Sequence, residues 1–506
     1  MNEKAGMELK PLDMEGEGIA DAHVSGIDLD YRASDLDAEF AEALPKPILE
    51  ANPDWIDLYW RCWAIAVDRV RKPDPKTGLK PFCDAAFSEN MFQWDTCFLI
   101  GFARYAAHVL PVENTLENFY KKQHDDGFIC REINSVSGKD FWDVDHPSAV
   151  NPPLFADAEW RLFQITGNTE RLRTSLGPLI AYYEWLAANR KHADGTGYWT
   201  TALASGMDNT PRTLPYGDDA HDHFGFVWMC LTAQQGLAAK RIHQIAKIVG
   251  NAEATARFAE EHEKLADYCE REFWHPDLGF YVDRDSEGAL TEVLTPAASW
   301  VPLLGKTTSE RFGQLVEAYL DPELFWRPHA LPSVSANHPS YHGGGNYWQG
   351  SVWPPLTMVT IKAMMANGRH DIASKIAENH IANIAEVQRK NGTVWENYAS
   401  EKAARGNISR PEFVGWTGCG PIEALIENVI GITPDASDMS IDWHSYRDDR
   451  HGIEDLTFDG AKCSLEYDPS RRLLKLETNK AITVHFHRGD QSRRIEAEAG
   501  LTQIEL

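Results

Sequence analysis

The sequence predicts a mainly α-helical protein, an α/α toroid followed by a small antiparallel β unit. Roughly eleven segments carry apolar residues at helical spacing. Their connections alternate between short turns and long loops, which is typical of helix pairs whose long loops gather at one mouth. After residue 433 the helical spacing is replaced by short alternating runs between turns, which indicate strands.

These patterns divide the chain into three regions. Residues 1–50 are polar and acidic and are expected to form an arm, with short structure near residues 44–49. Residues 51–433 form the helical barrel, and residues 434–506 form the β-rich C-terminal unit. The predicted strands cover 441–443, 461–467, 473–478 and 482–487.

The helical region opens on a clear start signal. Asn52 can cap a helix, and Pro53 suits the first helical position, where a missing N–H does no harm. Ile56, Trp60 and Trp63 then fall on one face. The predicted helices cover 52–70, 92–110, 113–123, 153–167, 169–190, 222–249, 251–273, 308–320, 353–367, 369–389 and 419–431. The long loops cover 124–152, 191–221, 274–305, 321–351 and 390–418.

Composition and charge exclude several classes of partner. A hydrophobic content of 43% is that of an ordinary globular protein. The net charge of −27 repels phosphate backbones and anionic lipid, so neither nucleic acid nor a membrane surface is expected to bind. Residues 1–20 lack the apolar core of a signal peptide, and no run approaches the roughly 20 apolar residues of a membrane span.

The eight cysteines are scattered without a Cys-x-x-Cys pair. Buried free thiols in a reducing compartment explain this pattern better than disulfides or a zinc site. The sequence therefore predicts a cytoplasmic protein without a metal or other cofactor. Its oligomeric state is left open.

The segment 346–355 combines aromatic side chains with an amide and a double proline. Flat rings such as those of Tyr347, Trp348 and Trp353 stack on the C–H faces of sugars, and the amide of Gln349 can hydrogen-bond to hydroxyls. The segment therefore resembles an aromatic rim at the start of a helix. The alternative is a core cluster, because buried aromatics are common in large helical proteins.

Three acidic motifs lie in or beside the long loops. They are Gln93-Trp94-Asp95, the segment 205–212 with Asp208, and the segment 393–398 with Glu396. Each sets a carboxylate against an aromatic or sulfur side chain, which favours the protonated form that a general acid needs. Glycoside hydrolysis uses two carboxyl groups across the scissile bond, and Asp208 and Glu396 are the predicted pair. The alternatives are a turn cap for Asp208 and an ordinary loop carboxylate for Glu396.

Other chemistries have less support. The sequence contains no His-Glu-x-x-His, no phosphate-binding glycine loop and no Gly-x-Ser-x-Gly elbow. His221 and His223 could bind a metal, but no third ligand is apparent at a useful spacing. They are interpreted as caps of the helix that follows.

Taken together in chain order, Trp94-Asp95, the Gly-Met-Asp208-Asn motif, Tyr347-Trp-Gln-Gly-Ser-Val-Trp353 and Trp395-Glu396-Asn-Tyr resemble glycoside hydrolase family 63. That family is related to the family 37 trehalases. Within it, the chain looks most like the short bacterial branch of mannosylglycerate and glucosylglycerate hydrolases. The resemblance implies an (α/α)6 barrel and an inverting mechanism with Asp208 as general acid and Glu396 as general base.

The resemblance also implies a substrate-binding set, in which Trp94, Asp95 and the aromatic segment hold the sugar. The expected substrate-binding residues are Trp94, Asp95, Gln123, Asn151, Asn209, Arg212, Tyr347, Trp348, Gln349, Trp353 and Trp395. Two positions depart from the family pattern and weigh against a glycerate group: Asn151 precedes two prolines, and Gln349 stands where relatives often have Arg.

The predicted function is hydrolysis of a small α-linked glycoside, an α-glucoside or α-mannoside, by an inverting α-glycosidase. A disaccharide or a compatible-solute conjugate is the expected carbohydrate substrate, because long loops close the mouth into a pocket. The alternatives are a sugar epimerase or an unsaturated-uronyl hydrolase on an α/α toroid, and a non-catalytic sugar-binding protein.

Overall fold

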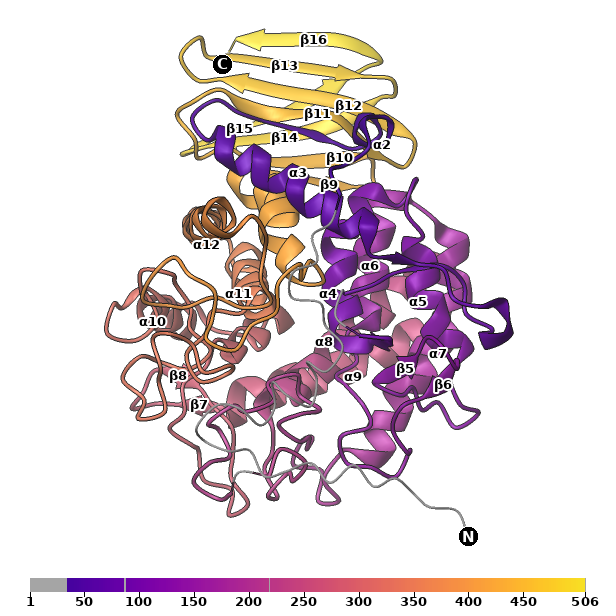
Figure 1. The fold of residues 1–506 in the computed structure, drawn as a ribbon, viewed down its shortest axis with the longest axis vertical. Helices are drawn as coiled ribbons and strands as arrows, with labels where there is room; N and C mark the ends of the chain where they lie inside the picture. Colours follow the sequence, from indigo (N-terminus) through magenta and orange to yellow (C-terminus); the bar gives the residue numbers. More distant parts are fainter. Residues whose placement is uncertain (1–33, 86–87, 218, 506) are drawn as a thin grey trace.

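The computed structural model of the protein describes residues 34–85, 88–217 and 219–505 (Figure 1). Helices make up most of the body, and a layered β unit covers one end of it. None of the described helices is long and apolar enough to cross a membrane. The predicted class, mainly helical with C-terminal strands, agrees with this arrangement.

The observed helices lie close to the predicted ones. They are α2 (Ala38–Glu42), α3 (Pro53–Asp68), α4 (Gln93–Ala103), α5 (Val112–Lys121), α6 (Phe155–Thr166), α7 (Thr169–Asn189), α8 (Met229–Val249), α9 (Ala252–Glu272), α10 (Ser309–Leu320), α11 (Pro354–Ala366), α12 (His370–Asn391) and the π-helix η6 (Gly420–Ile430). The short 3-10 helices are η1 (Pro75–Thr77), η2 (Arg104–Ala106), η3 (Pro296–Trp300), η4 (Pro302–Leu304) and η5 (Thr417–Cys419).

Several of these elements close a ring through their contacts. α4 packs on α6, α6 on α8, α8 on η3, η3 on α11, and α11 and α4 both contact η6. Outside them, α5 contacts α4, α7 and α9 contact α8, and α12 contacts α11 (Figure 1). Short turns at Gly167 and Gly368 and the long loops alternate around this ring, as the sequence predicts.

One helix starts later than predicted. α8 begins at Met229 rather than near residue 222, because Val227 bridges Arg284 and the Trp228 amide donates to Tyr198 O at 2.9 Å. These contacts hold the preceding backbone extended. Trp228 stands at the N-cap without a side-chain cap. The interpretation of His221 and His223 as helix caps is therefore wrong.

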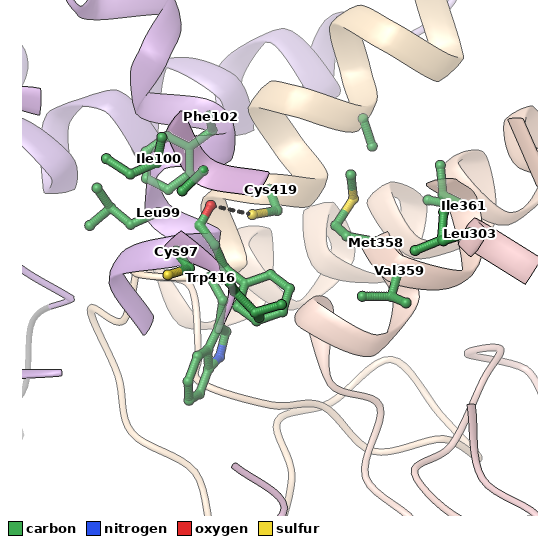
Figure 2. Close-up of a cluster of buried hydrophobic side chains, with 14 of the residues drawn as sticks. Cys97, Leu99, Ile100, Phe102, Leu303, Met358, Val359, Ile361, Trp416 and Cys419 are labelled. Atoms are coloured by element: carbon green, nitrogen blue, oxygen red, sulfur yellow. Dashed lines mark hydrogen bonds between the residues drawn. The ribbon is translucent and has the colours of Figure 1, made fainter. Parts of the chain in front are cut away.

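The body is held by a continuous apolar core. Around α4, α11 and η5, side chains including Phe102, Met358 and Trp416 pack together, and Cys419 Sγ lies 3.2 Å from Phe98 O (Figure 2). All eight cysteines are buried and free, as predicted from their scatter.

The β unit consists of two sheets with alternating buried side chains. The first has the order β1 (Lys46–Leu49), β11 (His451–Phe458), β12 (Ala461–Asp468), β13 (Leu473–Thr478) and β16 (Gly500–Glu505). The second has the order β15 (Gln491–Ala497), β14 (Ile482–Arg488), β10 (Ser440–His444) and β9 (Ile432–Asp435). Short strands in the loops are β2 (Val70–Arg71), β3 (Phe82–Cys83), β4 (Asn90–Phe92), β5 (Glu132–Asn134), β6 (Lys139–Asp140), β7 (Trp274–His275) and β8 (Phe280–Tyr281).

Two features of this unit differ from the prediction. β10 and β14 are parallel, because the chain visits the other sheet between them and returns in the same direction, so a purely antiparallel unit is wrong. The strand β1, near the end of the predicted arm, pairs with β11 and completes the first sheet. The part of the predicted arm at residues 1–33 lies outside the described residues.

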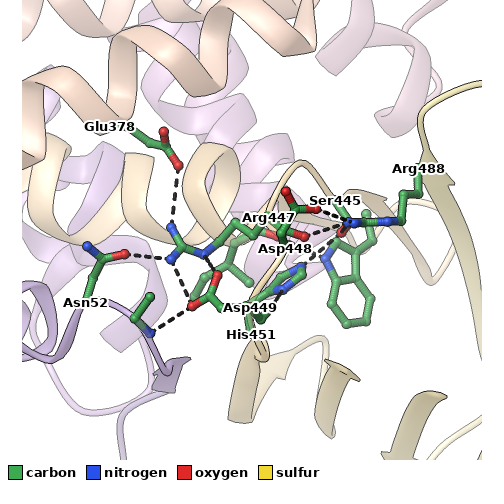
Figure 3. A network of polar contacts seen from close by, with 11 residues as sticks. Asn52, Glu378, Ser445, Arg447, Asp448, Asp449, His451 and Arg488 are labelled. Carbon is green, nitrogen blue, oxygen red and sulfur yellow. Dashed lines mark hydrogen bonds and ion pairs between the residues drawn. The ribbon is translucent and has the colours of Figure 1, made fainter. Parts of the chain in front are cut away.

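Polar contacts fix the β unit to the helices (Figure 3). Arg447, in the connection from β10 to β11, donates to Asn52 Oδ1 at 2.6 Å and to Asp449 Oδ1 at 2.8 Å. Its third partner is Glu378 of α12 at 3.4 Å. A single buried guanidinium thus joins α3, α12 and the β unit.

Candidate active site

Glu396 lies in the long connection between α12 and η5, where its backbone is held on both sides. Its amide donates to Arg410 O at 2.9 Å, and its carbonyl accepts from Trp416 Nε1 at 2.7 Å. The residue is 1% exposed. Oε1 accepts from Tyr347 OH at 3.4 Å and lies 3.6 Å from Arg410 Nη1, whereas Oε2 has no partner among the described residues. Oε1 is thus held in place by two neighbours, and Oε2 can accept a hydrogen bond from a ligand or water.

Asp208 lies in a tight turn that packs against α4. Within the turn, the Ser205 amide donates to Thr201 O at 2.9 Å and the Thr210 amide to Met207 O at 3.0 Å. Gly206 adopts φ +83°, and a Cβ there would lie 2.7 Å from Trp94 Cε2. Only glycine allows this approach. It places the half-buried Asp208 beside the start of α4.

Asp95 supplies a third carboxyl from the first turn of α4. The residue is 4% exposed, and its Oδ1 has no partner among the described residues. The same holds for Nε1 of the neighbouring Trp94. Buried polar atoms are almost always paired, so unpaired atoms gathered in one place mark a site for a polar ligand.

Electrostatics shows that the three carboxyls share one site. Burial raises the pKa of Asp208 to about 6, while Arg131 and Arg410 oppose the rise. Burial raises the pKa of Glu396 to about 7, Arg410 opposes it, and the charge of Asp208 adds to it. Burial also raises the pKa of Asp95 well above its usual value, and the charge of Glu396 contributes. Between pH 6 and pH 7 the Asp208–Glu396 pair therefore holds about one proton.

Asn209 connects the Asp208 turn to the aromatic segment. Its Oδ1 accepts from the Trp348 amide at 2.7 Å, and its Nδ2 donates to Asn346 O at 3.2 Å. Gln349 Nε2 donates to Asn209 O at 3.1 Å. The amides of Asn209 and Gln349 thus hold two loops together.

The aromatic segment forms a wall behind Glu396. Trp348 and Trp353 are buried and stack on each other, with ring centroids 3.7 Å apart and planes 5° apart. Trp353 Nε1 donates to Tyr347 O at 3.0 Å, and the two rings meet edge-on at 4.9 Å. Tyr347 has φ 55°, which is unusual for a bulky residue. The wall fixes this conformation and directs the Tyr347 hydroxyl to Glu396.

Two predicted substrate contacts are occupied by the scaffold. Arg212 forms a two-pronged pair with Asp283 at 2.6 and 2.5 Å, and its guanidinium lies over the Trp228 ring at 4.5 Å. Gln123 Nε2 donates to the carbonyls of Gly127 and Pro178, both at 3.0 Å. The donor groups of Arg212 and Gln123 therefore hold loops and helices in place.

Asn151 and Trp395 each present an unpaired polar atom. Asn151 Nδ2 donates to Ala204 O at 2.8 Å, near the Asp208 turn, and its Oδ1 has no partner among the described residues. Nε1 of the half-buried Trp395 is likewise without a partner there, while the Arg405 guanidinium lies over its ring at 5.0 Å.

Sequence reasoning missed the two cations of the site, Arg131 and Arg410. Arg131 Nη1 donates to Leu203 O at 2.8 Å, so this cation also holds the Asp208 turn. Each arginine lies in one of the long loops named above, and this location is the feature of the sequence that could have pointed to them. No spacing rule links them to the carboxyls. No group of three or more potential ligands suited to a metal ion occurs in the described part of the chain.

Comparisons with known proteins also indicate a glycoside hydrolase. Residues 88–417 match the model of the mannosylglycerate hydrolase MGH1-like glycoside hydrolase domain. An uncharacterized protein of Borreliella burgdorferi is 23% identical over 85% of this chain and 91% of its own length. A probable mannosyl-oligosaccharide glucosidase of Schizosaccharomyces pombe is 23% identical over 53% of this chain, and the aligned part covers 33% of that protein.

A solved structure shows the same fold at low identity. The GH63 mannosylglycerate hydrolase from Thermus thermophilus, in complex with glucose, superposes with a TM-score of 0.59 at 16% identity, over 72% of this chain and 99% of that chain. The family match covers well over half of the sequence and includes the candidate carboxyls. The chain therefore belongs to the family of MGH1-like glycoside hydrolase domains and is a glycoside hydrolase of the family 63 type.

Proposed function

We propose that this glycoside hydrolase is an inverting α-glycosidase that acts on a small α-linked glycoside, with Asp208 as general acid and Glu396 as general base. One observation carries the proposal. Asp208 and Glu396 come from separate loops, yet the charge of Asp208 acts on Glu396, and burial raises the pKa of both carboxyls. Two such groups are what glycoside hydrolysis requires.

The contacts of Glu396 suit a general base. Tyr347 and Arg410 hold Oε1, so the carboxylate is fixed in orientation. Oε2, which has no partner among the described residues, would accept the proton of the attacking water. Inversion needs room for that water, so we expect the two carboxyls to stand ~6.5–9.5 Å apart when substrate is bound.

Asp208 suits the general acid. It lies on a turn fixed by Gly206, Asn209 and Arg131. Its pKa of about 6 lies below that of Glu396, about 7, so the proton shared by the pair rests mainly on Glu396 in the free protein, and the proposed active form is the minority one in which Asp208 carries it. Protonation of the leaving oxygen then releases the aglycone.

The sugar would bind between the remaining unpaired polar atoms. Trp94 Nε1, Asp95 Oδ1 and Trp395 Nε1 supply donors and acceptors for hydroxyls, and aromatic faces stack on the C–H side of a pyranose. In this proposal Trp348 and Trp353 act by positioning Tyr347, and Asn209 and Gln349 by joining loops. Arg212 and Gln123 belong to the scaffold.

The proposal includes the architecture around the site. We assign an (α/α)6 barrel to residues 51–433, with α4, α6, α8, η3, α11 and η6 as its inner elements. The β unit follows from residue 434, with β9 (Ile432–Asp435) spanning the boundary, and the predicted arm 1–50 contributes β1 to it. Eight buried free thiols favour a reducing, cytoplasmic setting.

A panel of α-glucosides and α-mannosides tests the function, because the named relatives act on glucosyl and mannosyl groups. NMR of the first-formed anomer identifies the stereochemistry, and a β-anomer is expected. Asp208→Asn and Glu396→Gln should each lower kcat by about 10³-fold while circular dichroism stays unchanged. An α-anomer product excludes inversion, and near-normal turnover by either variant excludes the role given to that residue.

A further inference from the structure

A second aromatic cluster lies beside the carboxyl site and has no part in the mechanism above. It consists of Trp142, His146 and His221, which come from two separate loops. The ring centroids are 4.7 Å apart for Trp142 and His146, 5.9 Å for Trp142 and His221, and 4.9 Å for the two histidines. All three residues are half-buried, and Trp142 Nε1 has no partner among the described residues. The cluster is therefore partly exposed, and it retains a buried donor without a partner among the described residues.

Arg131 places this cluster on the Asp208 side of the site. Its guanidinium lies 6.0 Å from the centre of the Trp142 ring, and it also donates to Leu203 O in the Asp208 turn. Arg131 is the leading attractive charge on Asp208, whereas Arg410 is the leading one on Glu396. Arg131 therefore links the cluster directly to the turn that carries Asp208.

Ser148 couples the cluster to the Asp208 turn. Its Oγ shares hydrogen bonds with His221 Nδ1 at 2.9 Å and with Thr201 Oγ1 at 2.8 Å. Thr201 O in turn accepts from the Ser205 amide at 2.9 Å. The cluster and the turn are therefore parts of one hydrogen-bonded loop framework.

We propose that Trp142, His146 and His221 form the subsite for the aglycone, and that this subsite takes a neutral, hydroxylated group such as a second sugar or a polyol. The inference rests on the proposed function, because a general acid faces the leaving group. The cluster on the Asp208 side is then where the leaving group lies.

The chemistry of the cluster fits hydroxyls. The Trp142 ring offers a face for C–H groups. His146 Nδ1 accepts from the Ser148 amide at 3.1 Å, so a neutral His146 presents Nε2–H as a donor. His221 uses Nδ1 toward Ser148, which leaves its Nε2 for a ligand.

The charges around the cluster disfavour a carboxylate on the aglycone. Burial lowers the pKa values of His146 and His221, so both are neutral at pH 7. Arg131 Nε lies 3.3 Å from Glu132 Oε1, which balances its charge. Asp219 acts on both histidines and adds negative charge. Among these neighbours no positive charge is left unbalanced to pair with an anionic aglycone.

Glycosyl fluorides separate the two subsites, because fluoride leaves without occupying an aglycone site. We expect Trp142→Ala to lower kcat/KM for the preferred α-linked disaccharide by about 10-fold or more, and Trp142→Phe to restore most of it. Turnover of the α-glycosyl fluoride should change less than about 2-fold. Val144→Ala, in the same loop and 37% exposed, is the matched control and should leave both rates unchanged. Equal losses on disaccharide and fluoride, or no loss on the disaccharide, overturn the subsite.

A matched pair of substrates tests the charge of the aglycone. The glycosyl-glycerol and the glycosyl-glycerate differ only by a hydroxymethyl group in place of the carboxylate. We expect kcat/KM to favour the neutral compound by about 10-fold or more, and a preference for the glycerate overturns the inference. Failure of the proposed function is distinguishable, since wild type would then not hydrolyse the α-glycosyl fluorides and Glu396→Gln would make no difference.

Discussion

Replacing Gly206 with alanine tests whether the Asp208 turn depends on its close approach to Trp94. The backbone at Gly206 has φ +83°, and the new Cβ would lie 2.7, 2.8 and 3.0 Å from three atoms of the indole. Carbon atoms pack best at about 3.5–4.0 Å, so the turn or the ring must move by about 1 Å. Trp94 is 4% exposed and packs on Phe98 at 4.9 Å, so the ring has little room and the turn is expected to move.

The expected cost has a stability part and an activity part. The left-handed backbone costs alanine about 1–2 kcal/mol, and overpacking adds about 1–3 kcal/mol. A displacement of about 1 Å at a catalytic group lowers the rate by roughly 10²-fold. Gly206→Ala should therefore lower both the free energy of unfolding and kcat, even though the substituted residue has no functional group.

Gly250→Ala is the matched control. Gly250 has φ +78° at the end of α8, and a Cβ there meets nothing within 4 Å. It should lose about 1–2 kcal/mol in denaturant unfolding and keep wild-type kcat. Chemical denaturation and steady-state kinetics on one α-glycoside measure both quantities. If Gly206→Ala keeps wild-type kcat, or if both variants lose activity equally, the contact with Trp94 does not position Asp208.

Three further outcomes follow from the site. In the proposed mechanism the active form of the Asp208–Glu396 pair holds one proton, so kcat/KM should be bell-shaped with limbs near pH 6 and pH 7; a plateau from pH 5 to 9 contradicts this. The pKa of Glu396 rises from 4.5 to about 7 on folding, so ionisation destabilises the protein as pH rises through that window. Glu396→Gln should thus have a higher Tm than wild type at pH 8, with the difference shrinking toward pH 4.5, and a lower Tm at pH 8 refutes the sign. Asp283→Ala should lower the free energy of unfolding by about 3–5 kcal/mol, because it leaves Arg212 unpaired in the core, and KM should stay unchanged in the folded fraction. A raised KM at unchanged stability would show that Arg212 binds the substrate after all.

Local signals were sufficient for most of the helical body. α3 starts at Pro53 as the proline and the apolar spacing predict, but Asn52 makes no side-chain cap and its Oδ1 accepts from Arg447 instead. α12 ends before Gly392, which adopts a left-handed backbone. The start of α8 was misplaced because the contact of Val227 with Arg284 belongs to tertiary structure. The parallel pairing of β10 with β14 likewise depends on where the intervening strands go.

The site residues that the sequence did not predict also depend on tertiary contacts. The motifs of Asp208 and Glu396 name the carboxyls, but no local pattern links them to Arg131 and Arg410 in other loops. An aromatic-rich segment also cannot separate a ring that faces a ligand from one that faces another ring. Trp348 stacks on Trp353, a contact fixed only by how the loop folds back.

Strand β1 pairs with a strand that lies far away in the sequence. Lys46 contacts Asp455 at 2.9 Å across 409 residues, so the sheet receives this edge only after β11 has been synthesised. Until then the segment has no partner strand, and a prematurely terminated product keeps it bare. We expect chains ending before β11 to be cut by protease close to residues 46–49 and full-length protein to resist. Protection of this early segment thus depends on a strand that is synthesised 409 residues later.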